Sequence, residues 1–423
     1  MQIHVTHPGE TLWLIAQRYG VTVTQIVTAN KLENPNRLVP GMALVVPTAS
    51  GIHIVQPGEN LSEIAQRYGT TIQAITQANQ LQDPDMIAVG MRLTIPVQKP
   101  VIDVNAYTIN TGETGAREIQ EVGQYLTYWM PFAYSIQEDG GLTPVDDTTM
   151  LQAAAAEKIV PVLCITNFSS TETGSQLAHN ILASTDIQDQ LLTNIIKVMK
   201  EKGYRGINVD FENVLPADRE NYNQFLQRAV DRLHPEGYFV SSALAPKVSS
   251  EQQGLLYEAH DYEAQGKIVD FVVLMTYEWG YRFGPPQAIS PLNEIKRVLD
   301  YAVTVIPRDK IFFGFQIYAR DWLLPHVQGQ EAETFSQQEA IRRAIQYGAV
   351  IQYDPIAQSP FYRYTDAQGR QHEVWFEDAR SAQAKFTMVK DYHLRGISYW
   401  VLGYPFPQNW LLLEDNFTIR KIV

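Results

Sequence analysis

Eight apolar segments with strand character recur between residues 101 and 402, and stretches with the spacing of amphipathic helices separate several of them. Parallel strands need such crossover connections, and strands that alternate with helices form one parallel sheet. Eight units of this kind predict an α/β fold, a (β/α)8 TIM barrel, with the functional residues at the carboxyl ends of its strands. The expected strands are 101–108, 126–134, 159–166, 206–212, 238–245, 269–277, 310–318 and 396–402.

The barrel is expected to occupy residues 101–423, with a hinge before it and an insertion within it. The hinge is the stretch "VQKP" at 97–100. Residues 351–379 combine Gly, Pro and alternating aromatic residues in the last interval between a strand and a helix. This composition predicts a small inserted hairpin that overhangs the functional site.

The fourth expected strand carries polar side chains in the stretch "RGINVDFENV", residues 205–214. Asn208, Asp210 and Glu212 alternate with apolar residues, so they point to one side of the strand while the apolar set packs under the helices. Two neighbouring carboxyl groups in a partly dry setting cannot both ionise freely, and the retained proton suits a general acid. The alternative is that Asp210 and Glu212 form salt bridges at the strand end.

Composition excludes several classes of partner. The net charge of -13 and the pI near 5.2 oppose binding to nucleic acid or to an anionic membrane, and no apolar run is long enough for a membrane span. The single cysteine, Cys164, lies in an apolar run and is expected to fill the core. The nine histidines are scattered, so we expect neither a metal site nor a cofactor.

The first residues lead directly into a strand-like stretch, "QIHVT", with no basic segment followed by an apolar one. A secretion signal is therefore not expected, and the chain is expected to be synthesised in the cytoplasm without one.

The first hundred residues contain a repeat. Residues 3–47 align with residues 52–96 without a gap, at an offset of 49 residues, and about half of the positions are identical. Each copy has the pattern of a strand, a Pro-Gly turn, two short helices and a closing strand.

The repeat resembles the LysM family in "HPGETLWLIAQRYG", in the Ala-Asn pairs at 29–30 and 78–79, and in "VPGMALVVP". The resemblance implies two βααβ modules, at 1–48 and 50–97, that bind the N-acetylglucosamine-containing glycans of peptidoglycan or chitin. The alternative is a tandem module that mediates protein contacts only.

The barrel segment resembles glycoside hydrolase family 18. The fourth strand keeps Gly206, Asp210 and Glu212 of the signature Asp-Gly-x-Asp-x-Asp-x-Glu, but Arg205 replaces the first Asp and Asn208 the middle one. Three further motifs follow in the family's order: Met275, Tyr277 and Glu278 in "LMTYE", Gly314, Tyr318 and Arg320 in "GFQIYAR", and Trp400 in "GISYWVL".

The resemblance implies substrate-assisted hydrolysis. Glu212 would protonate the glycosidic oxygen, Asp210 would accept the acetamide N–H of the substrate, and Tyr277 would bond the acetamide oxygen. Trp400 would stack on the sugar. Asn208, Glu278 and Tyr318 complete the expected substrate-binding set.

The two resemblances together point to the spore cortex-lytic N-acetylglucosaminidases of endospore-forming bacteria. They imply a spore location, in coat or cortex, a peptidoglycan partner, and possible contacts with spore coat or cortex proteins. No Ser-x-Gly-Gly follows the third strand, where "LCITNF" stands instead. Two alternatives stay open: a hydrolase of chitin oligomers, and an inactive glycan-binding coat component, which Arg205 and Asn208 favour and the intact Asp210 and Glu212 oppose.

Overall fold

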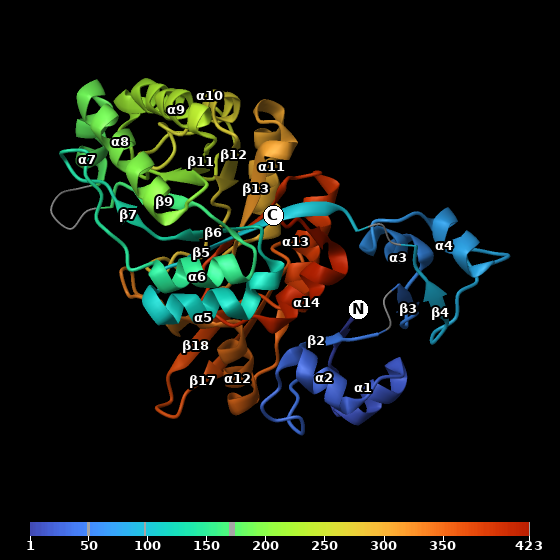
Figure 1. Ribbon diagram of the computed structural model, residues 1–423. Coiled ribbons are helices and arrows are strands. Elements are labelled where there is room, and N and C mark those ends of the chain that lie inside the picture. Colours follow the sequence, from blue (N-terminus) through green and yellow to red (C-terminus); the bar gives the residue numbers. More distant parts are fainter. Residues whose placement is uncertain (49–50, 97–98, 169–173, 423) are drawn as a thin grey trace.

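A ring of parallel strands forms the centre of the computed structural model, which describes residues 1–48, 51–96, 99–168 and 174–422 (Figure 1). The ring runs from β5 through β6, β8 with β9, β10, β11, β12, β13 and β19 back to β5. The predicted (β/α)8 barrel is confirmed. Its strands are β5 (Val101–Thr108), β6 (Tyr128–Pro131), β7 (Tyr134–Ser135), β8 (Val160–Pro161), β9 (Leu163–Thr166), β10 (Gly206–Asp210), β11 (Phe239–Leu244), β12 (Phe271–Leu274), β13 (Ile311–Gln316) and β19 (Gly396–Trp400).

Helices cover the outside of the ring because each carries one apolar stripe. In α11 the buried residues Ile295, Val298, Leu299 and Ala302 recur at intervals of three and one, the spacing of one helix face. The barrel helices are α5 (Gly112–Val122), α6 (Thr148–Ala156), α7 (Gly174–Leu182), α8 (Thr185–Lys202), α9 (Arg219–Leu233), α10 (Tyr262–Ile268), α11 (Leu292–Val305), α13 (Ala379–Asp391) and α14 (Pro407–Asn416); a short strand, β20 (Thr418–Ile419), pairs with β5.

The apolar side chains of the fourth strand, β10, pack under the helices, as their alternation predicted. Ile207, Val209 and Phe211 belong to the main core under the helices. A separate cluster fills the inside of the ring with aromatic side chains such as Tyr128 and Phe312, together with Cys164 and others. The barrel is therefore a packed core, and only its strand ends are open to ligands.

The inserted region is larger than the expected hairpin. Its strands form an antiparallel sheet in the order β15, β14, β18, β17, β16, to which 351–379 contributes three strands. The sheet begins where β13 ends, since β14 starts at Tyr318, two residues after Gln316. The elements are β14 (Tyr318–Leu324), β15 (Glu333–Ser336), α12 (Gln337–Tyr347), β16 (Gln352–Asp354), β17 (Ser359–Thr365) and β18 (Gln371–Trp375).

The two copies of the repeat fold alike, as two strands and two helices each. We call residues 1–48 the first module and residues 51–96 the second module. Thr22 caps α2 with a capping box, and Thr71 caps α4 at the equivalent position. The elements are β1 (Gln2–Val5), α1 (Leu12–Tyr19), α2 (Val23–Asn30) and β2 (Ala43–Val46), then β3 (Ile52–Ile54), α3 (Leu61–Arg67), α4 (Ile72–Asn79) and β4 (Arg92–Thr94).

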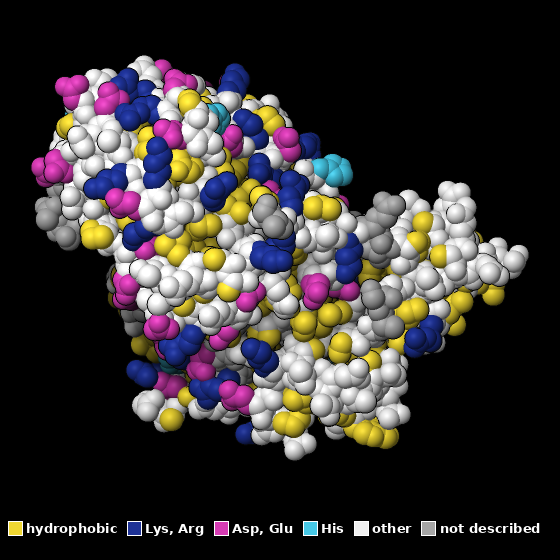
Figure 2. Space-filling view, in the orientation of Figure 1, with side chains coloured by type: hydrophobic (Ala, Val, Ile, Leu, Met, Phe, Trp, Pro, Cys, Tyr) yellow, Lys and Arg dark blue, Asp and Glu magenta, His cyan; other side chains and the backbone are white. Residues whose placement is uncertain are grey.

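The modules differ in their surroundings. Strand β2 and helix α2 of the first module contact α13 and α14 of the barrel, whereas the second module projects to one side (Figure 1). Figure 2 shows charged side chains of both signs intermixed over the barrel helices. The expected hinge at 97–100 falls partly on residues 97–98, which lie outside the described residues. Among the helices that are described, none is long and apolar enough to cross a membrane.

Candidate active site

Two acidic side chains lie at the carboxyl end of β10. Asp210 is the last residue of the strand and is 4% exposed, and Glu212 follows two residues later. Burial, followed by the charge of Glu212, raises the pKa of Asp210 well above its ordinary value. Burial, followed by the charge of Glu278, raises the pKa of Glu212 to about 7. The pair therefore holds at least one proton near neutral pH, which a general acid requires.

Tyr277 and Trp400 stand at the ends of two barrel strands, β12 and β19, with β13 between them. Tyr277 follows β12, and burial raises the pKa of its hydroxyl, so it stays a hydrogen-bond donor at any working pH. Trp400 ends β19, and its ring meets the edges of Phe132 at 4.8 Å and Tyr107 at 5.5 Å between centroids. These edge contacts hold the indole in a fixed orientation.

Glu278 is held by two residues of the inserted sheet. Arg320 forms a bidentate ion pair with it, at 2.8 Å and 3.0 Å, and the Tyr318 hydroxyl donates to the same carboxylate. Glu278 also has a φ of 72°, in the left-handed region that is strained for a residue with a side chain. The inserted sheet thus fixes the carboxylate whose charge contributes to the raised pKa of Glu212.

The structure places Asn208 beneath the site. It is fully buried inside the ring, where it accepts from the Tyr107 hydroxyl at 3.0 Å and donates to Ser241 at 3.0 Å. It is therefore separated from the residues that line the cleft. A neutral amide in this place satisfies both neighbours and avoids a further buried charge beside Asp210.

The remaining six predicted residues line one cleft of about 550 Å³. Sequence reasoning missed its aromatic rim, in which Phe168 and Tyr281 are largely exposed. The only signal for Phe132 was the aromatic richness of the second expected strand. The cleft is lined by Ile109, Phe132, Phe168, Asp210, Glu212, Pro246, Leu256, Tyr257, Met275, Tyr277, Glu278, Trp279, Tyr281, Arg282, Tyr318, Arg320, Thr334, Trp400, Val401 and Tyr404.

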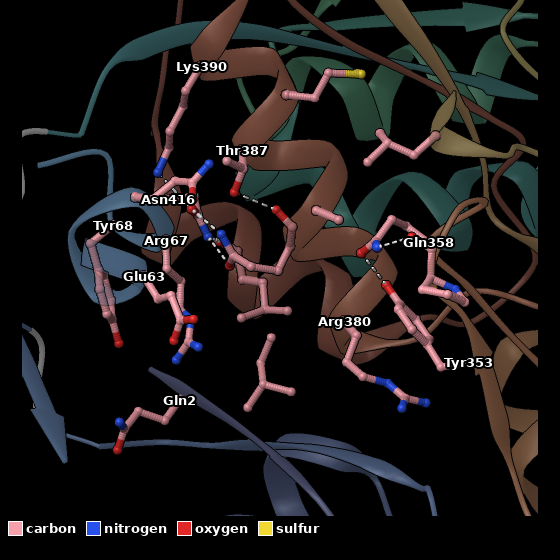
Figure 3. A pocket seen from close by; sticks show the side chains of 18 of the residues that line it. Gln2, Glu63, Arg67, Tyr68, Tyr353, Gln358, Arg380, Thr387, Lys390 and Asn416 are labelled. Atoms are coloured by element: carbon pink, nitrogen blue, oxygen red, sulfur yellow. Dashed lines mark hydrogen bonds between the residues drawn. The ribbon is translucent and has the colours of Figure 1, made fainter. Parts of the chain in front are cut away.

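A larger cavity of about 950 Å³ lies elsewhere, between the second module, β1, and helices α13 and α14 (Figure 3). Its polar groups are largely paired: Glu59 accepts from Arg67, and Lys390 donates to Asn416 at 2.7 Å. Burial lowers the pKa of Lys390 to about 8. The buried carboxyl pair with raised pKa values, Asp210 and Glu212, lines the smaller cleft, so size alone does not identify the site of chemistry.

Comparison with protein families agrees with this geometry. The family described as Glycosyl hydrolases family 18 matches residues 166–404, which include every residue predicted for the cleft. The LysM domain family matches twice, at residues 4–47 and 53–96.

Two similar proteins match the whole length of the chain, and a third matches about three quarters of it. The cortical fragment-lytic enzyme of Bacillus subtilis (strain 168) is 51% identical over 427 residues, covering 100% of this chain and 99% of the relative. The crystal structure of the Bacillus cereus spore cortex-lytic enzyme SleL matches with a TM-score of 0.93 and 42% identity, over 99% of this chain and 98% of that one. A chitinase of Chromobacterium violaceum matches with a TM-score of 0.68 and 26% identity, over 74% of this chain and 98% of its own.

Proposed function

The chain belongs to glycosyl hydrolases family 18 and is a glycosidase, and on this basis we propose that it cleaves spore cortex peptidoglycan fragments after N-acetylglucosamine. The likeness to full-length relatives, which include a cortical fragment-lytic enzyme and a spore cortex-lytic enzyme, supports this substrate. A spore-associated role follows from the same likeness.

One observation carries the proposed chemistry: a carboxyl group with a pKa of about 7, Glu212, shares a cleft with a second buried carboxyl, Asp210. Glu212 donates its proton to the glycosidic oxygen as that bond breaks, and later accepts a proton from the attacking water. When the substrate amide N–H donates a hydrogen bond to Asp210, it favours the ionised form of Asp210. The shared proton then stays on Glu212.

The nucleophile in this proposal is the acetamide oxygen of the substrate itself. An intramolecular group reaches an effective concentration of about 10⁵ M or more. Asp210 accepts the amide N–H and stabilises the positive oxazolinium, Tyr277 donates to the acetamide oxygen, and Trp400 stacks on the sugar. Two inversions at the anomeric carbon give products with retained β configuration.

The choice of bond follows from the same chemistry. Muramic residues of spore cortex that have become lactams carry no free acetamide, so they cannot supply the nucleophile. The sugar that stacks on Trp400 is therefore N-acetylglucosamine in this proposal. Fragments reduced with borohydride should carry reduced N-acetylglucosamine ends, and reduced muramic ends would contradict the assignment.

The central test replaces the acid. Glu212→Gln keeps size and hydrogen bonding but removes the titrating proton, so kcat should fall by about 10³-fold or more while glycan binding persists. Glu118→Gln is a matched control, because Glu118 is a partly buried carboxyl with a raised pKa on α5 and lies outside the cleft. Turnover of Glu212→Gln near the wild-type rate would overturn the role of Glu212.

Stability gives an independent test of the raised pKa. The pKa of Glu212 rises from an ordinary 4.5 to about 7, so ionisation opposes folding above pH 7 and has no such effect below about 4.5. Glu212→Gln should therefore raise the unfolding midpoint by roughly 5 °C at pH 8 and leave it unchanged at pH 4.5. If Glu212→Gln and the wild type have the same unfolding midpoint at pH 8 as well as at pH 4.5, the Glu212 carboxyl is solvated and its pKa is not raised by burial.

A second candidate, hydrolysis of chitin oligomers, is favoured by the likeness to the Chromobacterium violaceum chitinase. A digest that compares cortex fragments, vegetative sacculi and chitin oligomers separates the candidates. We expect cortex fragments to be cleaved fastest. Faster cleavage of chitin oligomers would favour the second candidate, and no cleavage of any substrate would favour a glycan-binding coat component.

The two LysM modules are proposed to dock the enzyme on the glycan. Two linked weak sites raise retention through effective concentration, without taking part in the chemistry. Pelleting with insoluble spore peptidoglycan measures this retention directly.

A further inference from the structure

Glu212 lies beyond the sheet that precedes it. The pairing of β10 with β9 ends at Asp210 opposite Thr166, and its pairing with β11 ends at Val209 opposite Ser242. Backbone groups past the end of a strand must find other partners or water. Around Glu212, four of these backbone groups are held by side chains.

Asn167 takes the place of the missing strand on one side. It directly follows β9 and is fully buried. Its amide oxygen accepts from the Glu212 N–H at 2.8 Å, and its amide nitrogen donates to the Glu212 carbonyl at 2.7 Å and to the Gly174 carbonyl at 2.9 Å. One amide side chain therefore offers both the acceptor and the donor that a neighbouring strand would supply.

His260 holds the other side. It is 1% exposed, its Nδ1 accepts from the Ala245 N–H at 2.7 Å, and its Nε2 bonds the Phe211 carbonyl at 2.9 Å. A backbone N–H only donates and a carbonyl only accepts, so the ring is neutral with its proton on Nε2. Burial lowers the pKa of His260 to about 4, which preserves this form at neutral pH.

The next residue is fixed as well. Ser175 donates to the Asn213 carbonyl at 2.6 Å, and Asn213 has a φ of 53°, which turns the chain away from the strand direction. Gly174 permits the close approach on this side, since a Cβ there would lie 2.9 Å from the Asn167 carbonyl. The chain thus leaves the strand direction directly after Glu212, at Asn213.

We propose that Asn167 and His260 are positioning residues that hold the backbone of Glu212 so that its carboxyl stands in the cleft with Asp210 and Tyr277. The proposal rests on the acid role of Glu212 proposed above. A displacement of about 1 Å at a reacting group lowers turnover by about 10²-fold, whereas the sugar-binding surface of Trp400 and Tyr277 does not depend on either residue.

The first experiment uses Asn167→Ala, which removes the acceptor and both donors. We expect kcat to fall by about 10²-fold and KM to stay within about threefold. The limb of the pH profile that reports Glu212 should move toward lower pH, because a displaced Glu212 is better solvated and farther from the charge of Glu278. Asn167→Asp, which keeps the acceptor and loses the donor, should be intermediate in kcat.

Gln188→Ala is the matched control. Gln188 is also a buried amide that donates to two backbone carbonyls, those of Ile181 and Leu182, but it belongs to α8 and bonds the end of α7. We expect it to lower the unfolding midpoint about as much as Asn167→Ala while leaving kcat and the pH profile unchanged. An equal loss of kcat in the control would show that Asn167 acts only through general stability and would overturn the proposal.

The second experiment compares His260→Leu with His260→Gln. A glutamine offers one donor and one acceptor, so it should restore at least tenfold of the kcat that leucine loses. Equal kcat in both variants would overturn the role of His260. If Glu212→Gln is inactive while Asn167→Ala has wild-type kcat, this inference fails alone; if Glu212→Gln is active, the proposed function fails first.

Discussion

The two LysM modules share a sequence pattern and an internal design but differ in what surrounds them. In each, a histidine of the first strand contacts a glutamate of the following turn, His4 with Glu10 and His53 with Glu59. In each, an asparagine at the end of the second helix bonds the closing strand. The first module supplies much of a hydrophobic cluster that it shares with the inserted sheet of the barrel, and Ile54 is the contribution of the second module.

The difference is concentrated on one face. Ala43 and Val45 of β2 are buried against the barrel, and the equivalent positions in β4 are the exposed Arg92 and Thr94. Gln408 of α14 donates to Asn30 at 2.7 Å, across the same face. The described part of the second module forms hydrogen bonds with only three residues outside it, Met1, Gln2 and Thr48. Two apolar residues in a repeat thus distinguish the module whose closing strand packs against the barrel from the module whose closing strand is largely exposed.

The largest expected effect comes from removing both modules, compared with removing the second module alone. A chain that begins at residue 99 loses the first-module part of the hydrophobic cluster that includes Phe335, Ile351, Tyr362 and Val374, so its unfolding midpoint should fall by roughly 10 °C or more. Replacing residues 52–96 by a Gly-Ser linker of equal length should change the midpoint of the barrel by less than about 3 °C. Calorimetry measures both, and equal losses would show that the second module is also part of the fold.

The paired glycines Gly41 and Gly90 test the contact itself. Both have positive φ, 82° and 83°, so alanine brings similar backbone strain to each. At Gly41 a Cβ would lie 1.8 Å from the Ile351 carbonyl oxygen, while at Gly90 nothing lies within 4 Å. Gly41→Ala should therefore cost about 2–3 kcal/mol more than Gly90→Ala in urea unfolding. Equal losses of unfolding free energy in the two variants would mean that the backbone at Ile351 moves away and relieves the clash.

The contact between His53 and Glu59 in the second module gives a further test of the comparison, because His4 and Glu10 form the same contact in the first module. Hydrogen bonds from His53 and the Gln56 backbone outweigh burial and lower the pKa of Glu59 to about 2. This stabilisation is complete above pH 4.5 and is lost as the pH falls toward 2. Glu59→Gln should cost about 2 kcal/mol at pH 7 and nothing at pH 2, as followed by hydrogen exchange in residues 51–96. Glu10→Gln is the control with the smaller expected effect, and a pH-independent cost would contradict the pairing.

A reciprocal exchange gives the smallest expected effect. Val45→Thr places a hydroxyl in a fully buried site and should cost about 1 kcal/mol. Thr94→Val, at the equivalent exposed position, should change stability by less than about 0.5 kcal/mol. Similar values for the two would show that the face of β2 is not distinguished by burial.

Local patterns predicted much of this molecule. The repeat and the eight strands follow from periodicity, and the six cleft residues were expected from alternation in the fourth strand together with the resemblance to the family motifs. All six lie together because the strand ends meet at one edge of the ring. The alternation at Asn208, Asp210 and Glu212 predicted which side chains face inward. It did not predict that Asn208 is covered, because depth inside a barrel depends on neighbours such as Tyr107 and Ser241 from distant strands.

What sequence reasoning missed depends on long-range partners. The first strand of the inserted sheet, β14, was not predicted, because only Ile317 separates it from β13 and the expected strand 310–318 ended at its first residue. Asn167 and His260 carry no periodic signal, and the only hint was an asparagine directly after a strand. The packing of the first module could not be predicted, because its partner Gln408 lies 378 residues from Asn30.

The packing of β2 against the barrel also has a consequence for synthesis. The ribosome makes the first module at the start, but α13 and α14, which pack against β2, come near the end of the chain. At about 5–20 residues per second, the face formed by Ala43 and Val45 waits roughly 20–70 s for them. A neighbouring nascent chain offers the same partners, so strong overexpression should favour dimers that exchange their first modules, and slower translation should suppress them.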